Sequence, residues 1–327
     1  MKKLDFVIAW VDGSDENHRL KRQQFQPENV VKGAVEDTRF AHNDEIYFSI
    51  ASILKYVPYC GTIYIITDHQ QPSFVGEFEA QGLCRSGQIQ VVDHQEIFRN
   101  YQQYLPTFNS LSIESMLWNI KGISNHFIYL NDDFFFNQQS DLSDFLIDGQ
   151  MVIYGHWQAT LIKKMKYIFR KFLQQNFGMV AEAKYSTAQM LSADRVGMTR
   201  YYEIHHRPHI LSRDLLSTYF KNNKELLEQQ IQFKFRNIDQ LLPVGLSNHL
   251  AIQSDQAILK DDIDIAYLKD GRDLEKFILA LSNSEIKFGC IQSLDQLESL
   301  AEGRIRAALI QKFTGFLPSQ IQPTTVV

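Results

Sequence analysis

The stretch Phe127-Ile128-Tyr129-Leu130-Asn131-Asp132-Asp133-Phe134-Phe135-Phe136 decides the fold of this chain. It opens with four apolar or aromatic residues in succession, which predicts a strand buried on both faces, as in a parallel sheet. Asp132 and Asp133 then stand at the end of that strand, where open α/β sheets bind their ligands. Two adjacent carboxylates near a core need a cation or hydrogen-bond donors. The alternative is an Asx-rich turn in which both side chains cap backbone amides.

Three further apolar runs also end in an aspartate, namely Leu4–Val11 before Asp12, Thr62–Thr67 before Asp68, and Ile89–Val92 before Asp93. Helical patterns lie between these runs, over Glu16–Phe25 and Ile46–Tyr56. Strands and helices that alternate with short links predict βαβ units. We therefore expect an α/β fold built on a doubly wound, mostly parallel, Rossmann-like sheet.

The composition excludes several classes of protein. A chain of 327 residues with 44% hydrophobic and 22% charged residues forms one large globular domain or two modest ones. A net charge of −5 argues against a general nucleic-acid binder. Three widely spaced cysteines form neither a disulfide framework nor a zinc motif, which fits a reducing compartment. No signal peptide and no apolar run of about 18 residues is evident, so we expect a cytoplasmic protein or one peripheral on the inner face of the plasma membrane.

Polar residues gather in three loops. Asp12, Gly13 and Asp15 follow the first strand, where the glycine lets the backbone approach a ligand closely, although this is also ordinary turn chemistry. Helix capping explains one acidic residue before Ile46, but not the gathering of Arg39, Asn43, Asp44 and Glu45. A third loop holds side chains that either donate to phosphate and sugar oxygens or cap the next helix: Thr107, Asn109 and Ser110.

The segment Leu161–Val180 is basic and amphipathic. A helix that lies on a membrane surface has this composition, and a domain helix with a solvated basic face is the alternative. If the segment docks on anionic lipid, replacing Lys163, Lys164 and Arg170 with Gln should lower vesicle binding.

The second half of the chain holds a histidine cluster around Pro208, formed by His205, His206 and His209. No cysteine or carboxylate stands there at zinc spacing, which favours a base or a phosphate contact over a zinc site. A helix is expected over Arg213–Gln230, and a strand over Ile286–Ile291.

Four ordered blocks of the chain resemble the Stealth family of sugar-phosphate transferases. That family includes bacterial capsule and cell-surface polysaccharide phosphotransferases and the animal enzyme that puts GlcNAc-1-phosphate on lysosomal glycoproteins. The matching blocks are Asp5–Asp15, Arg39–Thr67 together with Leu105–Phe136, His206–His209 with Phe235-Arg236, and Lys287–Gln320. The fourth block departs from the family, which has Asn-Asp directly after its Cys-Leu strand end. Here Gln292 and Ser293 follow Cys290-Ile291, which leaves Asp295 as a substitute or the site with one carboxylate fewer.

The resemblance implies transfer of a hexose-1-phosphate or N-acetylhexosamine-1-phosphate from a UDP-sugar to an acceptor hydroxyl. The reaction forms a phosphodiester, releases UMP and serves bacterial capsule or cell-surface polysaccharide synthesis. The acceptor would be lipid-linked or an oligosaccharide. One alternative is a metal-dependent glycosyltransferase of the GT-A type, which would release UDP, and another is a non-catalytic assembly partner.

The same resemblance implies roles for single residues. Asp132 and Asp133, with Asp295 as a weaker candidate, would hold Mg²⁺ or Mn²⁺. His206 would act as general base or as nucleophile, and Arg236 would stabilise the transferred phosphoryl charge. The remaining candidates would bind the nucleotide, sugar and phosphates: Asp12, Gly13, Asp15, Arg39, Asn43, Asp44, Thr107, Asn109, Ser110 and Asn131. We expect residues 1–137 to form the nucleotide-sugar-binding core, 138–200 a helical insertion on the membrane or acceptor side, and 201–327 a part that completes the site.

Overall fold

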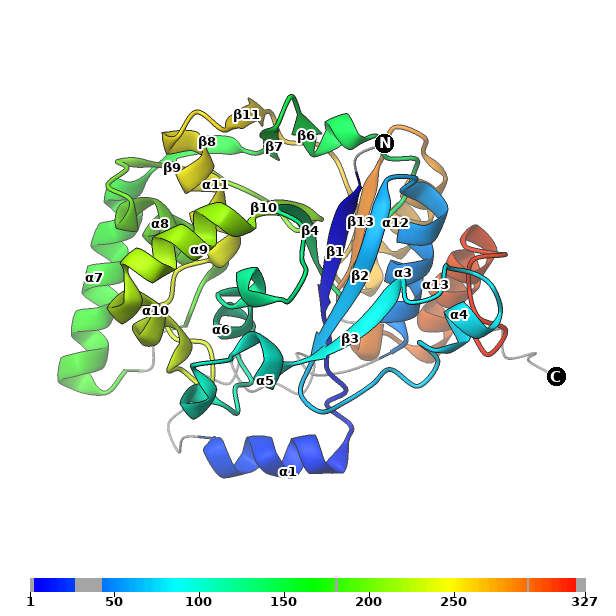
Figure 1. Ribbon diagram of the computed structural model, residues 1–327, viewed down its shortest axis with the longest axis horizontal. Coiled ribbons are helices and arrows are strands. Elements are labelled where there is room, and N and C mark those ends of the chain that lie inside the picture. The colour runs from blue at the N-terminus through cyan, green and yellow to red at the C-terminus, as the bar shows by residue number, and fades with distance from the viewer. Residues whose placement is uncertain (1–2, 27–42, 180–181, 293, 322–327) are drawn as a thin grey trace.

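The computed structural model describes residues 3–26, 43–179, 182–292 and 294–321. Its central sheet contains β1 (Leu4–Ala9), β2 (Cys60–Thr67), β3 (Ile89–Asp93), β4 (His126–Asn131) and β10 (His209–Ser212). These strands lie in the order β10–β4–β1–β2–β3, as Figure 1 shows. The first four are parallel, and β10 joins β4 in antiparallel orientation. The predicted mostly parallel sheet is confirmed.

Burial explains why these apolar runs become strands. Phe6, Val7 and Ile8 in β1 are fully buried although successive side chains point to opposite faces of a sheet. Phe127, Ile128 and Leu130 in β4 are also 0% exposed. Both strands are therefore covered on both faces, as a run without alternation predicts.

The strand order places the site. From β1 the chain builds β2 and β3 on one side, and then adds β4 on the other side of β1. In such doubly wound sheets, the crevice for a ligand lies at the carboxyl ends of the two strands beside this reversal. Asp12 follows β1 and Asp132 follows β4, so both are carried to the same edge of the sheet.

Smaller sheets extend the centre. β5 (Phe134–Phe136) pairs antiparallel with β13 (Phe288–Ile291), which pairs in turn with β12 (Ala266–Leu268). The strand expected near Ile286–Ile291 is confirmed. A second sheet joins β6 (Leu146–Ile147), β7 (Gln150–Tyr154) and β11 (Ala257–Lys260). β8 (His156–Ala159) and β9 (Arg200–Glu203) form a separate antiparallel pair. Strands from the last third of the chain thus complete sheets that its middle third begins.

Helices cover both sides of the central sheet (Figure 1). The helices are α1 (Glu16–Phe25), α3 (Glu45–Tyr56), α4 (Glu77–Ala80), α5 (His94–Ile97), α6 (Ser110–Glu114), α7 (Thr160–Phe177), α8 (Tyr185–Arg195), α9 (Arg213–Asn222), α10 (Lys224–Ile231), α11 (Pro243–Gln253), α12 (Leu274–Ser282) and α13 (Ser299–Lys312). The single helix expected over Arg213–Gln230 is wrong, because Asn223 leaves the helical region at φ −128° and ψ 57° and separates α9 from α10. Within the described ranges, no helix is long and apolar enough to cross a bilayer.

The orientation of α7 differs from the solvated basic face that the sequence allowed. Lys163 lies 3.4 Å from Glu203, Lys164 lies 2.5 Å from Asp194, and Lys171 lies 2.9 Å from Asp239. These lysines point toward the rest of the protein, whereas the large apolar residues of α7 are exposed. The Gln substitutions at Lys163 and Lys164 would therefore disturb the attachment of the helix to its own domain.

Gly289 in β13 is expected to tolerate no side chain. A Cβ atom there would lie 2.1 Å from Cζ of Phe135, whose ring is buried in the core. Gly289→Ala should therefore lower the free energy of unfolding by about 1–3 kcal/mol, the usual cost of overpacking a core. Chemical denaturation checks this, with Gly303→Ala as the control, since a Cβ at Gly303 meets nothing within 4 Å. A Gly289→Ala chain as stable as the parent would contradict the packing of β13 on β5.

Candidate functional site

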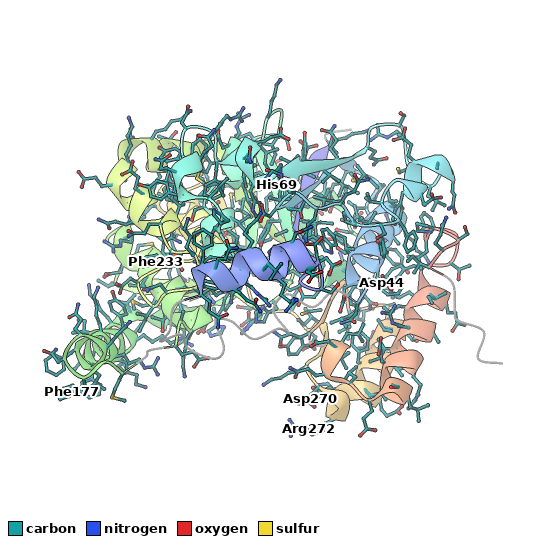
Figure 2. All side chains as sticks on the ribbon, turned by 90° about the horizontal axis from the view of Figure 1, so that it is seen from below. Asp44, His69, Phe177, Phe233, Asp270 and Arg272 are labelled. Atoms are coloured by element: carbon teal, nitrogen blue, oxygen red, sulfur yellow. The ribbon has the colours of Figure 1, made fainter. Side chains whose placement is uncertain are left out.

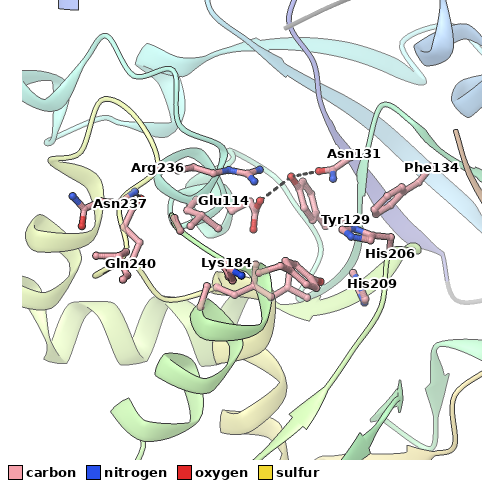
Figure 3. Close-up of a pocket in the computed structure, with 17 residues that line it drawn as sticks. Glu114, Tyr129, Asn131, Phe134, Lys184, His206, His209, Arg236, Asn237 and Gln240 are labelled. Carbon is pink, nitrogen blue, oxygen red and sulfur yellow. Dashed lines mark hydrogen bonds between the residues drawn. The ribbon is translucent and has the colours of Figure 1, made fainter. Parts of the chain in front are cut away.

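A pocket of about 700 Å³, part of it open to solvent, lies beyond the end of β4 (Figure 3). Its lining comes from α6, β4, the start of α8, the segment before β10, and the segment before α11. The side chains that matter below are Glu114, Tyr129, Asn131, Phe134, Tyr185, His206, His209 and Arg236. The fold thus brings together Asn131, His206 and Arg236, which the sequence selected from distant segments.

In the sequence, Asp132 and Asp133 lie between Asn131 and Phe134, which both line the pocket. Oδ2 of Asp133 accepts a hydrogen bond from the thiol of Cys290 at 3.4 Å, while its buried Oδ1 has no hydrogen-bond partner among the described residues. Burial raises the pKa of Asp133 to about 6. Burial also raises the pKa of Asp132, with repulsion from Asp133 adding to the effect. Backbone amides of the turn lower both pKa values, so the Asx-turn alternative is partly correct, but desolvation outweighs them.

Glu45 is a third carboxylate of this group. It opens α3, is 8% exposed, and accepts a hydrogen bond from the backbone N–H of Asn43 at 2.6 Å. Burial raises the pKa of Glu45 to about 7, and the charge of Asp133 raises it further. We call Glu45, Asp132 and Asp133 the carboxylate cluster. Its oxygen donors suit Mg²⁺ or Mn²⁺, and the buried Oδ1 of Asp133 without a partner fits a cation ligand.

Glu114 is the residue that sequence reasoning missed. It ends α6, is 5% exposed, and its Oε2 has no hydrogen-bond partner among the described residues. Burial raises its pKa to about 7, although the charge of Arg236 and a 3.3 Å hydrogen bond from the hydroxyl of Tyr129 lower it. The signal in the sequence was weak, a single Glu in the apolar pattern Ser112–Leu117.

The positive charge of Arg236 acts on Glu114, on Asp133 and on His206. Its Nη2 donates to Oγ of Ser110 at 2.7 Å. Its positive charge lowers the pKa of Glu114 and of Asp133, and it also lowers the pKa of His206. One guanidinium is therefore close enough to act on both acidic groups and on the imidazole.

His206 is held between aromatic rings at the pocket wall. Its ring stacks on that of Tyr185 with centroids 5.0 Å apart, and lies parallel to the ring of Tyr267 at 6.3 Å. Burial lowers its pKa from 6.5, with the charges of His205 and Arg236 adding to the effect. His209 also lines the pocket, and its Nε2 is buried without a hydrogen-bond partner in the described structure. Both imidazoles are therefore neutral near pH 7, as proton acceptors must be.

Thr107 and Asn109 do not reach the pocket. Asn109 is fully buried, caps α6 through the backbone N–H of Leu111, and donates to Gln240 at 2.8 Å. The hydroxyl of Thr107 donates to the backbone carbonyl of Phe233. Capping, the alternative that the sequence left open, accounts for Asn109, and both residues position the segment that carries Arg236.

Asp44, near the start of α3, makes structural contacts, as Thr107 and Asn109 do. Asp44 has a positive φ of 65° and pairs with Arg306 of α13 at 2.9 Å, while Arg306 also donates to the carbonyl of Asn43. Asp44 thus has a structural partner in the fourth block instead of being a free sugar ligand. Arg39 lies outside the described residues.

The first loop is built from turn contacts. Asp15 caps α1 through the backbone N–H of His18, which agrees with ordinary turn chemistry. Asp12 accepts hydrogen bonds from the backbone N–H and the hydroxyl of Ser14, the residue after Gly13. The charge of Asp12 acts on Tyr47 together with that of Asp44, so the loop lies near the start of α3 rather than in the pocket lining.

Two groups of side chains other than the carboxylate cluster bring their possible ligand atoms within 4.8 Å of one another. Among the described residues, His156, His205 and Asp262 form one such group, and Asp68, His69 and Asp93 form another. Asp68 already pairs with Lys21, and Asp93 accepts from backbone N–H groups. Asp295 is exposed in a 3₁₀ turn, Leu294–Gln296, and we leave it out of the carboxylate cluster.

Parts of this chain match known proteins. A family model described as "Stealth protein CR2, conserved region 2" matches residues 39–153. The capsular polysaccharide phosphotransferase cps1A of Actinobacillus pleuropneumoniae is 39% identical over 145 residues, which are 43% of this chain and 38% of that relative. The exopolysaccharide phosphotransferase SCO2592 of Streptomyces coelicolor is 30% identical over 271 residues, 82% of this chain and 27% of the relative. The matches thus span well under half of the length of either relative.

Among solved structures, the apo form of the WbbM bifunctional glycosyltransferase resembles the chain with a TM-score of 0.47 and 8% identity, over 96% of this chain and 50% of that one. The matched region 39–153 holds β4, Asp132, Asp133, Glu45 and Glu114. By this match and by its relatives, the chain carries conserved region 2 of the Stealth family in residues 39–153.

Proposed function

We propose that this protein transfers a sugar-1-phosphate from a UDP-sugar to an acceptor hydroxyl, forming a phosphodiester and releasing UMP, in bacterial capsule or cell-surface polysaccharide synthesis. The bond that breaks is the P–O bond inside the diphosphate, and the anomeric linkage survives. The observation that carries the proposal is that Arg236 and His206 line one pocket, while the charge of Arg236 also acts on Asp133 of the carboxylate cluster. The phosphotransferase names of the relatives support the same reaction class.

The residues present fit a divalent cation. The carboxylate cluster would hold it, because desolvation disfavours the ionised form of all three carboxylates and their oxygen atoms suit Mg²⁺ or Mn²⁺. When bound, such a cation neutralises the charge of a diphosphate. Asn131 would donate its amide N–H to the sugar or phosphate, since its Oδ1 already accepts from Tyr129 at 2.9 Å.

The proton and charge steps fall to the protein's own side chains. His206 takes the proton of the attacking hydroxyl, because its imidazole is neutral at working pH. Once ionised, the carboxylate of Glu114 holds the guanidinium of Arg236 in the pocket by its charge. The guanidinium of Arg236 binds the oxygens of the transferred phosphoryl group, with Ser110 orienting it.

The released nucleotide tests the proposal. The chain is incubated with a panel of UDP-sugars, Mg²⁺ or Mn²⁺, and capsule oligosaccharides, and the nucleotide and the product linkage are identified by chromatography and ³¹P NMR. We expect UMP and a phosphodiester. UDP with a plain glycoside would establish the glycosyltransferase alternative, and no nucleotide release with any donor would overturn catalysis.

A further inference from the structure

The apolar residues of α7 face solvent. We define the α7 apolar face as Leu161, Ile162, Met165, Ile168, Phe169 and Phe172, whose exposed fractions range from 52% to 67%. Helical periodicity puts these positions on one side of α7. Phe177, the last residue of α7, and Met179, just beyond it, are also exposed, at 68% and 56%.

Ion pairs fix this orientation. Lys163, Lys164 and Lys171 bind carboxylates of the surrounding elements, and the hydroxyl of Tyr167 donates to Asp239 at 2.7 Å. A surface helix normally turns its apolar stripe toward the core, and α7 does the opposite. Contiguous exposed apolar surface of this kind marks an interaction site.

The position of α7 leaves the face accessible. The helix runs along the outer edge of the molecule (Figure 1), and Phe177 lies at its protruding end in Figure 2. Ala183, Lys184 and Tyr185 follow closely in the chain and line the pocket. In the sequence, the pocket lining therefore begins six residues after the last residue of α7.

The charges beside the α7 apolar face indicate which kind of partner it binds. α7 carries five basic residues and no acidic residue. Lys166 is exposed, and helical spacing places Lys166 and Arg170 along one border of the apolar face, one turn apart. Two copies that met through this face would bring their basic borders together. Anionic lipid headgroups complement the same borders, while acyl chains accept the apolar side chains.

We propose that α7 docks in the plane of an anionic lipid bilayer, with the α7 apolar face inserted below the headgroups. The burial of apolar side chains drives docking, and the basic border adds electrostatic attraction. If the proposed function holds, docking also brings the pocket to acceptors carried on lipid. The docking itself is measured without any transfer reaction, so its failure and that of the proposed function are separable.

Flotation with vesicles tests the proposal. The full chain is mixed with vesicles of phosphatidylcholine and phosphatidylglycerol in equal parts, and with vesicles of phosphatidylcholine alone. A triple variant, Leu161→Gln, Ile168→Gln and Phe172→Gln, should partition at least about tenfold more weakly than the parent into the anionic vesicles. Because these side chains are exposed, the variant should keep the thermal unfolding midpoint of the parent.

Two further variants make the result specific. Leu279→Gln with Leu300→Gln removes residues that are 73% and 80% exposed outside α7, and should leave partitioning unchanged. Lys166→Gln with Arg170→Gln should shrink the preference for anionic over neutral vesicles. Parent-like partitioning of the triple variant would overturn the proposal. So would a parent that ignores vesicles and forms a dimer, by analytical ultracentrifugation, that the triple variant abolishes, because the face would then join two copies.

Discussion

Glu114→Gln is expected to abolish transfer and to stabilise the protein above pH 7. Gln keeps the volume and can still accept from Tyr129, but it carries no charge to hold Arg236 at the transferred phosphoryl group. Loss of one electrostatic contact in an active site typically lowers kcat by about 10²–10³-fold. Steady-state kinetics of UMP release measures the loss.

The gain in stability follows from the pKa of Glu114. Burial raises that pKa from 4.5 to about 7, so between these pH values the native state keeps a proton that the unfolded chain releases. Stability then falls as pH rises through this window, and the penalty is complete above it. Gln has no such proton, so its gain is small at pH 5 and largest at pH 8, with an upper bound of about 3 kcal/mol at 1.36 kcal/mol per pKa unit.

Urea denaturation at the two pH values checks the sign. Glu225→Gln, an exposed position in α10, is the matched control and should change neither activity nor stability. If Glu114→Gln were fully active, the role of Glu114 in holding Arg236 would fail. If it were destabilising at pH 8, the ionised carboxylate of Glu114 would be stabilised by its surroundings, and the raised pKa would be contradicted.

Asp133→Asn is expected to remove both transfer and the response to divalent cations. The amide preserves shape and an acceptor for Cys290, but it removes the charge that a cation requires. In the parent, Mg²⁺ or Mn²⁺ at a hundredfold excess over its dissociation constant should stabilise the fold by about 2.7 kcal/mol. The variant should show no such shift in thermal unfolding.

The same measurement has a pH dependence. Burial raises the pKa of Asp133 to about 6 and that of Glu45 to about 7, so protons compete with a cation at these carboxylates. Cation binding by the parent should strengthen as pH rises from 5 to 8. Asp270→Asn, at a surface position paired with Arg272, is the control and should retain the full shift. A cation response that survives Asp133→Asn would place the metal elsewhere, with the group of His156, His205 and Asp262 as the next site to mutate.

The sequence predicted the sheet well because its strands are buried on both faces. A run such as Phe127–Leu130 has few structural solutions, and its neighbours Asp132 and Asp133 must then lie at the carboxyl edge. It could not separate ligand contacts from scaffolding in loops, since Asn109 as a cap and Asn109 as a ligand have the same local pattern. Glu114 stayed hidden because its role arises from Arg236, 122 positions later, which only the tertiary structure brings close.

The pairing of β4 with β10 and of β5 with β13 has a consequence for how the protein matures. β4 and β5 come from the first half of the chain, but their antiparallel neighbours follow about 80 and 150 residues later. Such long-range pairing is slow, and a ribosome-bound chain would hold an open sheet edge until residue 291 emerges. The conserved region alone should therefore be insoluble, and residues as far as Ile291 must be made before Asp133 gains its contact with Cys290.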